Sequence, residues 1–346
     1  MKVARFYAPG DIRIETAPEP APGPGDVKIR VRNCSACGTD VKIFRFGHHR
    51  ISPPRVMGHE IAGEITEVGP SVTGWAPGDR VQVIAAIPDG SCAECRRGAL
   101  TVCLHQESIG YQYDGGFAEY MVVPAKVLAV GGLNRIPDGT GFAEASVTEP
   151  LACVLNGQEL ARVGTGDDVV VLGAGPIGCL HVRLARARGA ARVFLADLSQ
   201  ARLDMAAALV RPDAAICSAA TDPVDAVAKL TDGRGADVVI TAAASAEAQR
   251  QAVVMAARQG RVSFFGGLPQ DHPDTTVDAN LVHYRELTIV GANGSSPAHN
   301  TRALQLIASG QVEIGDLITR RLPLDGLLDG LNAIREGAVI KVTIEP

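Results

Sequence analysis

The spacing of hydrophobic positions differs between the two halves of the chain. Between residues 27 and 130, short runs of β-branched and other apolar residues, such as 27–31 and 80–84, are interrupted by glycine and proline. This pattern predicts short strands in an antiparallel, barrel-like region. Residues 1–5 lead directly into a further strand-like stretch.

From about residue 151 onward, strand-like apolar runs alternate with segments of helical spacing. Predicted strands at 169–172 and 192–196 precede predicted helices at 177–188 and 200–209. Such alternation favours a parallel, doubly wound sheet with helices on both faces. The pattern further predicts strands at 214–216, 237–240, 261–265 and up to about 290, helices at 301–307 and 327–335, and a last strand at 339–344.

Length and composition narrow the classes of protein. A chain of 346 residues exceeds what one hydrophobic core usually serves, which favours two lobes. The net charge of −5 gives no general attraction to nucleic acid or to anionic membranes, and no run approaches 18 apolar residues. We therefore expect a cytoplasmic protein with neither partner. Eight cysteines without a secretion signal indicate reduced thiols and, where they cluster, a bound metal.

A glycine-rich segment joins the predicted strand at 169–172 to the helix that follows it. Its sequence matches the dinucleotide fingerprint G-x-G-x-x-G, and the expected cofactor-binding residues are Gly173, Gly175, Pro176, Ile177 and Gly178. The glycines permit a tight turn, close approach of the backbone to a pyrophosphate, and close packing of helix on strand. A helix N-terminus also favours an anion. A glycine turn without a ligand is the alternative, and the strand-turn-helix context argues against it.

Asp197 ends the next predicted strand, about twenty residues beyond the fingerprint. A carboxylate at this position can bond the ribose hydroxyls and repels a 2′-phosphate, so NAD is favoured over NADP. Arg202 is a further candidate for cofactor binding. The alternative role for Asp197 is to cap the following helix.

Two short segments in the N-terminal half carry potential metal ligands. One contains Cys37, Thr39 and Asp40, and the other contains His59 and Glu60. A thiolate, an imidazole and a carboxylate together suit zinc, which accepts sulfur, nitrogen and oxygen ligands. Each residue alone is weak evidence, because a single cysteine is more often a small buried hydrophobe.

These motifs resemble one family when they are taken together and in order. The sequence is similar to the zinc-containing medium-chain alcohol dehydrogenases, and within them to the sorbitol (polyol) and threonine dehydrogenase branch. The resemblance covers essentially the whole chain, and the segments that carry it are Cys37 to Asp40, Gly58 to Glu60, Trp75 to Val81, Glu149 to Leu151 and Gly173 to Gly178.

The resemblance implies an α/β protein of two lobes. A mainly-β, GroES-like catalytic domain would comprise residues 1–151 and be completed by a C-terminal segment, 291–346. A Rossmann NAD-binding domain, a doubly wound parallel sheet, would comprise residues 152–290. Relatives form homodimers or homotetramers, and we expect a homo-oligomer here.

The resemblance also assigns roles at the catalytic zinc. Cys37 and His59 would be ligands, Glu60 a direct or exchangeable ligand, and Glu149 would bind the metal or hold its water. Zinc acts as a Lewis acid that lowers the pKa of a bound alcohol, so that an alkoxide forms near neutral pH and expels hydride. Thr39 would relay the proton, although its hydroxyl could equally satisfy a turn. Many relatives carry a histidine soon afterwards, where this chain has Lys42.

A second metal is predicted in the segment 89–103. The family pattern of four cysteines has an aspartate in first position here, and the expected set is Asp89, Cys92, Cys95 and Cys103. A carboxylate is an acceptable zinc ligand beside three thiolates, so we expect a structural zinc. The alternative is a metal-free loop with reduced cysteines.

The expected activity is oxidation of a secondary alcohol, with hydride transferred to NAD. Glu60 and Glu149 make the surroundings of the metal polar, which favours a polyol, cyclitol or sugar-derived alcohol over an apolar one. A threonine-type amino-alcohol or a simple alcohol is the alternative substrate. The metal ligands argue against a zinc-free quinone-type reductase and against a non-catalytic relative. Acidic net charge argues against a zinc-ribbon protein that binds nucleic acid.

Overall fold

The computed structural model describes all 346 residues and divides into two compact units. The first unit combines Met1–Ala152 with Gly294–Pro346, and the second is Cys153–Asn293. The boundary falls within helix α5 (Thr148–Leu160). No helix of the chain has both the length and the apolar character that a membrane span requires.

A seven-stranded sheet forms the framework of the first unit. Its strand order is β10-β6-β5-β3-β18-β17, and β9 pairs with β3 outside this path. The strands are β3 (Val27–Ala36), β5 (Glu60–Val68), β6 (Arg80–Val83), β9 (Tyr120–Val123), β10 (Leu133–Arg135), β17 (Ile318–Pro323) and β18 (Lys341–Glu345).

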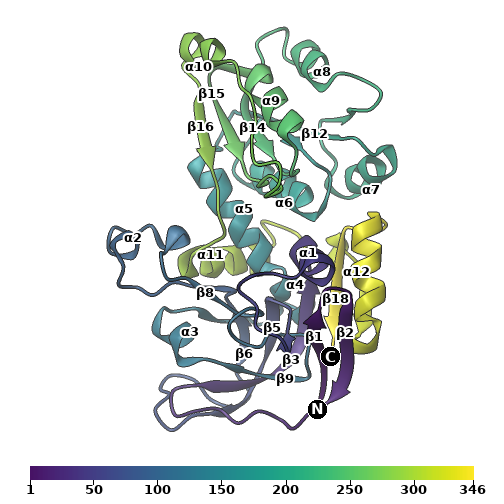
Figure 1. Cartoon of the computed structure of the whole chain (residues 1–346). Coiled ribbons are helices and arrows are strands. Elements are labelled where there is room, and N and C mark those ends of the chain that lie inside the picture. The colour runs from purple at the N-terminus through teal and green to yellow at the C-terminus, as the bar shows by residue number, and fades with distance from the viewer. The chain divides into compact units, whose positions relative to one another are not determined.

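Strand β3 shows why these residues form a half-buried sheet. Val27, Ile29 and Val31 are buried, whereas the intervening Lys28 and Arg30 are not, as the two-residue period of a strand requires. The C-terminal strand β18 inserts between β3 and β17, so both ends of the unit share one sheet. Figure 1 shows this yellow strand beside the purple N-terminal strands.

Smaller elements complete the first unit. A three-stranded sheet contains β1 (Lys2–Ala8), β2 (Asp11–Thr16) and β4 (Arg55–Val56), and a two-stranded sheet contains β7 (Ala86–Ile87) and β8 (Glu107–Ser108). The helices are α1 (Gly38–Phe46), α2 (Ala93–Arg96), α3 (Ala125–Ala129), α4 (Phe142–Ser146), α11 (Pro297–Ala308) and α12 (Leu327–Glu336), with short 3-10 turns at Leu100–Val102, Gly315–Leu317 and Leu324–Gly326.

The second unit is built on a six-stranded parallel sheet with the order β13-β12-β11-β14-β15-β16. Its strands are β11 (Asp168–Leu172), β12 (Arg192–Asp197), β13 (Ala214–Cys217), β14 (Ala236–Thr241), β15 (Ala256–Phe264) and β16 (Thr288–Gly291). Every residue of the central strand β11 is buried, which is typical of a parallel sheet covered on both faces.

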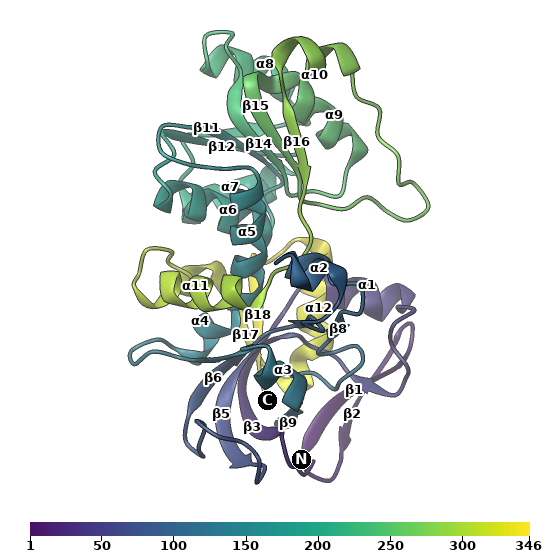
Figure 2. The same ribbon diagram turned by 90° about the vertical axis from the view of Figure 1, so that its left-hand side faces the viewer.

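Helices cover both faces of this parallel sheet. Helices α6 (Pro176–Ala187) and α7 (Gln200–Val210) pack together beside β11, β12 and β13, and α8 (Pro223–Leu230), α9 (Ala246–Met255) and α10 (Ala279–Arg285) form a second group. Figure 2 shows the two groups on opposite sides of the strands. The doubly wound parallel fold predicted from the alternating pattern is therefore confirmed.

Candidate functional site

Cys37, His59 and Glu60 converge in the first unit because of how β3 pairs with β5. Ser35 on β3 lies opposite Glu60 at the start of β5, so the residues at these two strand ends become neighbours. One ligand atom of each of the three residues lies within 4.8 Å of the others, and Cys37 Sγ is 3.4 Å from His59 Nε2. We call these three residues the catalytic cluster.

The local backbone fixes the thiol of this cluster. Cys37 is the N-cap of α1, and its Sγ accepts a hydrogen bond from the Thr39 N–H at 3.2 Å. The Cys37 N–H in turn donates to Asp40 Oδ2 at 3.0 Å. Because N–H groups and the dipole of a helix N-terminus favour negative charge, this position suits a thiolate ligand.

Asp40 places a buried carboxylate behind the His59 ring. Its carboxylate is fully buried, and Oδ1 lies 3.6 Å from His59 Nδ1, on the opposite side of the ring from the thiol. A metal-binding histidine commonly directs its second ring nitrogen to a carboxylate, which fixes the ring and its tautomer. Oδ1 has no hydrogen-bond partner, so it is available to take that role when the ring of His59 binds a metal.

Lys341 brings a positive charge to the cluster from the C-terminal strand β18. Its side chain is 3% exposed, and its Nζ forms an ion pair with Glu60 Oε2, an atom that is itself buried. Burial opposes the charged form of Lys341, but the negative charges of Glu60 and Cys37 outweigh that effect and raise its pKa. The Glu60 carboxylate therefore lies close both to the Lys341 ammonium and to the ligand atoms of Cys37 and His59.

The pKa values of Glu60 and His59 both differ from the usual values of these residues. Burial raises the pKa of Glu60 to about 7, although Lys341 acts in the opposite direction. For His59, burial lowers the pKa, but the charges of Cys37 and Asp40 overcome it and leave the pKa well above its usual value. The shift of His59 shows that negative charge surrounds this ring, whereas the shift of Glu60 reflects mainly its burial.

Glu149 lies in the first turn of α5 and contributes to this negative field. Its charge raises the pKa of both His59 and Glu60. It is not among the three residues whose ligand atoms lie within 4.8 Å of one another. Its expected role at the metal therefore stays a prediction, as does the relay role of Thr39, whose side chain is half-buried.

The donor set fits zinc. One sulfur, one imidazole nitrogen and one carboxylate oxygen are three ligands of the types that catalytic zinc uses, and three ligands leave a fourth position open. Cys37, His59 and Glu60 would hold the ion, with Asp40 behind the histidine. A bound zinc supplies Lewis-acid chemistry towards an oxygen of the substrate.

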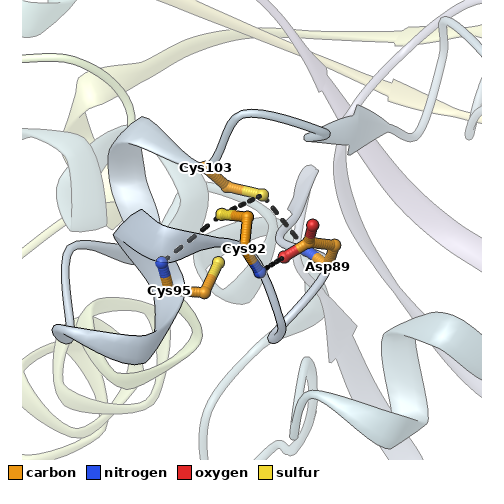
Figure 3. A group of neighbouring side chains, drawn as sticks. All are labelled: Asp89, Cys92, Cys95 and Cys103. Atoms are coloured by element: carbon orange, nitrogen blue, oxygen red, sulfur yellow. Dashed lines mark hydrogen bonds between the residues drawn. The ribbon is translucent and has the colours of Figure 1, made fainter.

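A second group of donors lies in the loop that contains α2. Asp89, Cys92, Cys95 and Cys103 place one ligand atom each within 4.8 Å of one another, and the three cysteines are buried. Figure 3 shows the three sulfur atoms and the carboxylate facing a common centre. We call these four residues the loop cluster.

Backbone N–H groups surround the loop cluster. Cys92 Sγ accepts from the Cys95 N–H at 3.4 Å, and Cys103 Sγ accepts from the Asp89 N–H at 3.2 Å. Burial raises the pKa of Cys95 to about 12, whereas the N–H of Cys95 lowers the pKa of Cys92. Three sulfurs and one oxygen form a complete tetrahedral set, so the loop cluster fits a structural zinc with no open position.

The predicted dinucleotide loop lies between β11 and α6 in the second unit. Gly173 adopts a φ of +118°, and a Cβ at Gly178 would lie only 1.8 Å from the Gly173 oxygen, so both positions need glycine. Pro176 occupies the first turn of α6, where no N–H is required.

The carboxylate of Asp197 bonds the glycine-rich loop, and Asp197 is not the N-cap of helix α7. Its Oδ2 accepts from the Ala174 N–H at 2.8 Å, inside the fingerprint, and its Oδ1 accepts from the Ser199 N–H at 2.8 Å. The N-cap of α7 is Ser199, whose hydroxyl accepts from the Arg202 N–H. The carboxylate is thus fixed at the end of β12, beside the glycine-rich turn.

Two family models match parts of both units of this chain. The sequence profile described as alcohol dehydrogenase GroES-like domain matches residues 23–132, and the profile described as zinc-binding dehydrogenase matches residues 176–309. The chain is 33% identical to a sorbitol dehydrogenase of Halalkalibacterium halodurans, over 98% of this chain and 97% of that protein. It is 35% identical to an L-threonine 3-dehydrogenase of Bacillus licheniformis, over 96% and 94% of the two chains.

A solved structure shows the same architecture. A crystal structure of a putative zinc-binding dehydrogenase from Sinorhizobium meliloti, bound to NADP, superimposes with a TM-score of 0.92 at 34% identity and covers 100% of this chain and 99% of that chain. The present chain is therefore a zinc-binding dehydrogenase, with a GroES-like domain and a Rossmann domain. Within the zinc-containing medium-chain dehydrogenases it belongs to the sorbitol and threonine dehydrogenase branch.

Two residues near the clusters were not found from the sequence. Lys341 follows Ile340 and precedes Val342, which is the alternating pattern of a strand with an outward lysine. His105 lies two residues beyond Cys103, and its Nδ1 is 2.7 Å from Asp89 Oδ2. The only available signal for His105 was its position next to a metal motif.

Proposed function

We propose that this chain oxidises a secondary alcohol and transfers hydride to NAD. The carbinol carbon loses its hydrogen with the bonding electron pair to the nicotinamide ring, the hydroxyl proton leaves to solvent, and the alcohol becomes a ketone. The observation that supports this function best is the catalytic cluster, which has three zinc-type donors and a buried histidine with negative charge around its ring.

Each residue of the catalytic cluster and its surroundings has a separate proposed role. Cys37, His59 and Glu60 would hold the metal, and Asp40 keeps the His59 ring in place through the contact at Nδ1. Lys341 balances the charge of Glu60. Thr39 is the proposed proton relay, because its hydroxyl belongs to the residue whose N–H already bonds the thiol of Cys37.

The preference for NAD rests on Asp197. Its carboxylate is held by two backbone N–H groups at the end of β12, where a 2′-phosphate would meet a fixed negative charge. We expect kcat/KM with NAD to exceed that with NADP by at least about tenfold, which corresponds to about 1.4 kcal/mol. Asp197→Asn removes the charge at constant size and should reduce that ratio about tenfold or more. Equal or better use of NADP by the wild type would contradict the proposal.

The proposed substrate is a polyol, a cyclitol or a sugar-derived alcohol. The buried carboxylate of Glu60 and the field of Glu149 favour a polar substrate over an apolar one. A panel of polyols, amino-alcohols and simple alcohols, each with NAD, tests this. The highest kcat/KM is expected with a polyol or a related polar secondary alcohol, and fastest turnover of ethanol or benzyl alcohol would contradict it.

An amino-alcohol is the second candidate substrate. The same negative charges that raise the pKa of His59 would attract an ammonium group, and one relative is an L-threonine 3-dehydrogenase. Highest kcat/KM with an amino-alcohol in the same panel would favour this candidate.

We also propose a homodimer or homotetramer, which light scattering of the purified chain would establish.

A further inference from the structure

The carboxylate of Asp89 has hydrogen-bond partners at both of its oxygens. Oδ1 accepts from the Ser91 N–H at 2.8 Å and from the Cys92 N–H at 2.9 Å. Oδ2 lies 2.7 Å from His105 Nδ1. The two backbone donors account for both lone pairs of Oδ1, whereas His105 accounts for only one of those on Oδ2. Oδ2 is therefore the oxygen with capacity left for a metal.

A carboxylate in this set needs more orientation than a thiolate. A thiolate presents one sulfur, but a carboxylate rotates and can offer either oxygen, with one or both bonded. Hydrogen bonds to a ligating carboxylate remove that freedom, and such outer contacts commonly change metal affinity by about 10-fold to 100-fold. Asp89 stands beside three cysteines, so it is the one member of the loop cluster to which this applies.

Asp89 is the most exposed residue of the loop cluster, and His105 lies beside it. The three cysteines are 7%, 7% and 9% exposed, whereas Asp89 and His105 line a cavity of 320 Å³ together with residues that include Glu107 and Lys126. The His105 side chain is 72% exposed and that of Asp89 is 19% exposed. Solvent and small chelators therefore reach the cluster from the Asp89 side first.

We propose that His105 is a positioning residue of the second metal site: its Nδ1–H holds Asp89 Oδ2 in the orientation that completes the three-thiol set. In the neutral ring this assigns the proton to Nδ1 and leaves Nε2 to the solvent. Loss of the contact would leave Oδ2 without its side-chain partner while Oδ1 keeps its two backbone N–H groups, and Asp89 would then hold a bound ion less firmly. The role does not depend on the substrate or on the cofactor.

The test measures the release of zinc from the full-length holoenzyme to a chromogenic chelator. Wild type should hold two zinc ions per chain, and the same assay on Cys37→Ser identifies the phase that belongs to the loop cluster. His105→Leu should speed up that phase by about 10-fold to 100-fold. His105→Asn, whose side-chain amide can place an N–H near the position of Nδ1, should restore most of the wild-type rate.

Lys126→Gln is the matched control, because Lys126 lines the same cavity but its Nζ bonds Glu107. It should release zinc at the wild-type rate. Unchanged release from His105→Leu would overturn the proposal, and so would a wild-type protein with zinc in the catalytic cluster alone. Neither result bears on alcohol oxidation, so a failure here is distinct from a failure of the proposed function.

Discussion

The two candidate metal sites differ in how far apart their residues lie in the sequence. The loop cluster takes all four donors from residues 89–103 and is held by N–H groups of the same loop. The catalytic cluster takes Cys37, His59 and Glu60 from two segments and its buried cation from Lys341, on a strand near the C-terminus. One group therefore depends on a local turn, and the other depends on the complete sheet.

The charges around the two groups differ as well. The catalytic cluster has a buried lysine paired with Glu60, and the charge of Glu149 acts on both Glu60 and His59. The loop cluster has backbone N–H groups and one exposed histidine. The comparison indicates that the catalytic cluster depends on charges from distant parts of the chain, whereas the loop cluster depends on neighbours from its own loop.

The largest expected effect is that of Cys37→Ser. Loss of the thiolate should remove the catalytic ion and reduce kcat/KM for the alcohol by about a thousandfold or more, which is about 4 kcal/mol. Zinc analysis should still find one ion, in the loop cluster. Full activity of this variant is the outcome that the catalytic assignment does not survive.

Cys92→Ser tests whether the loop cluster holds a zinc ion that stabilises the fold. A structural zinc contributes directly to folding free energy, so the variant should lose the loop ion and unfold at a temperature lower by about 5 °C or more. Differential scanning calorimetry measures this change. Activity per folded molecule should stay within a few-fold of wild type, and unchanged thermal stability would show that the loop needs no metal.

Asp40→Asn should weaken the catalytic cluster while leaving the three ligand residues themselves unchanged. The neutral amide holds the His59 ring less well, so zinc affinity at this site should fall by about 10-fold to 100-fold. Competition with a chelator of known affinity measures the loss. The ion of the loop cluster is the internal control, and equal losses at both sites would contradict a local role for Asp40.

Lys341→Met should shift the pH dependence of zinc retention at the catalytic cluster. Lys341 lowers the pKa of Glu60, which burial has raised to about 7, so removal of the lysine raises that pKa further. Protons then compete for Glu60 at higher pH, and the midpoint pH of zinc loss should rise by roughly one unit, or about 1.4 kcal/mol. Lys341→Arg keeps the charge and should move the midpoint less. A downward shift in Lys341→Met would contradict the assigned sign.

Local features could be predicted from the sequence and distant contacts could not. Helix α6 was predicted at 177–188 and is Pro176–Ala187, because its apolar period and its glycine turn are both short-range signals. Strand β15 was predicted at 261–265 but begins at Ala256, since its first part contains Arg258, Gln259 and Gly260, which do not resemble a strand. The burial of Lys341 follows from where β18 inserts in the sheet, and no local pattern encodes that.

The position of β18 at the end of the chain means that its residues are synthesised last. Residues 89–103 leave the ribosome before residue 341, so all four donors of the loop cluster are available while the rest of the chain is still being made. The lysine that balances Glu60 arrives only with the final strand. The charge balance of the catalytic cluster is therefore complete only once the end of the chain has been synthesised and β18 has joined the sheet.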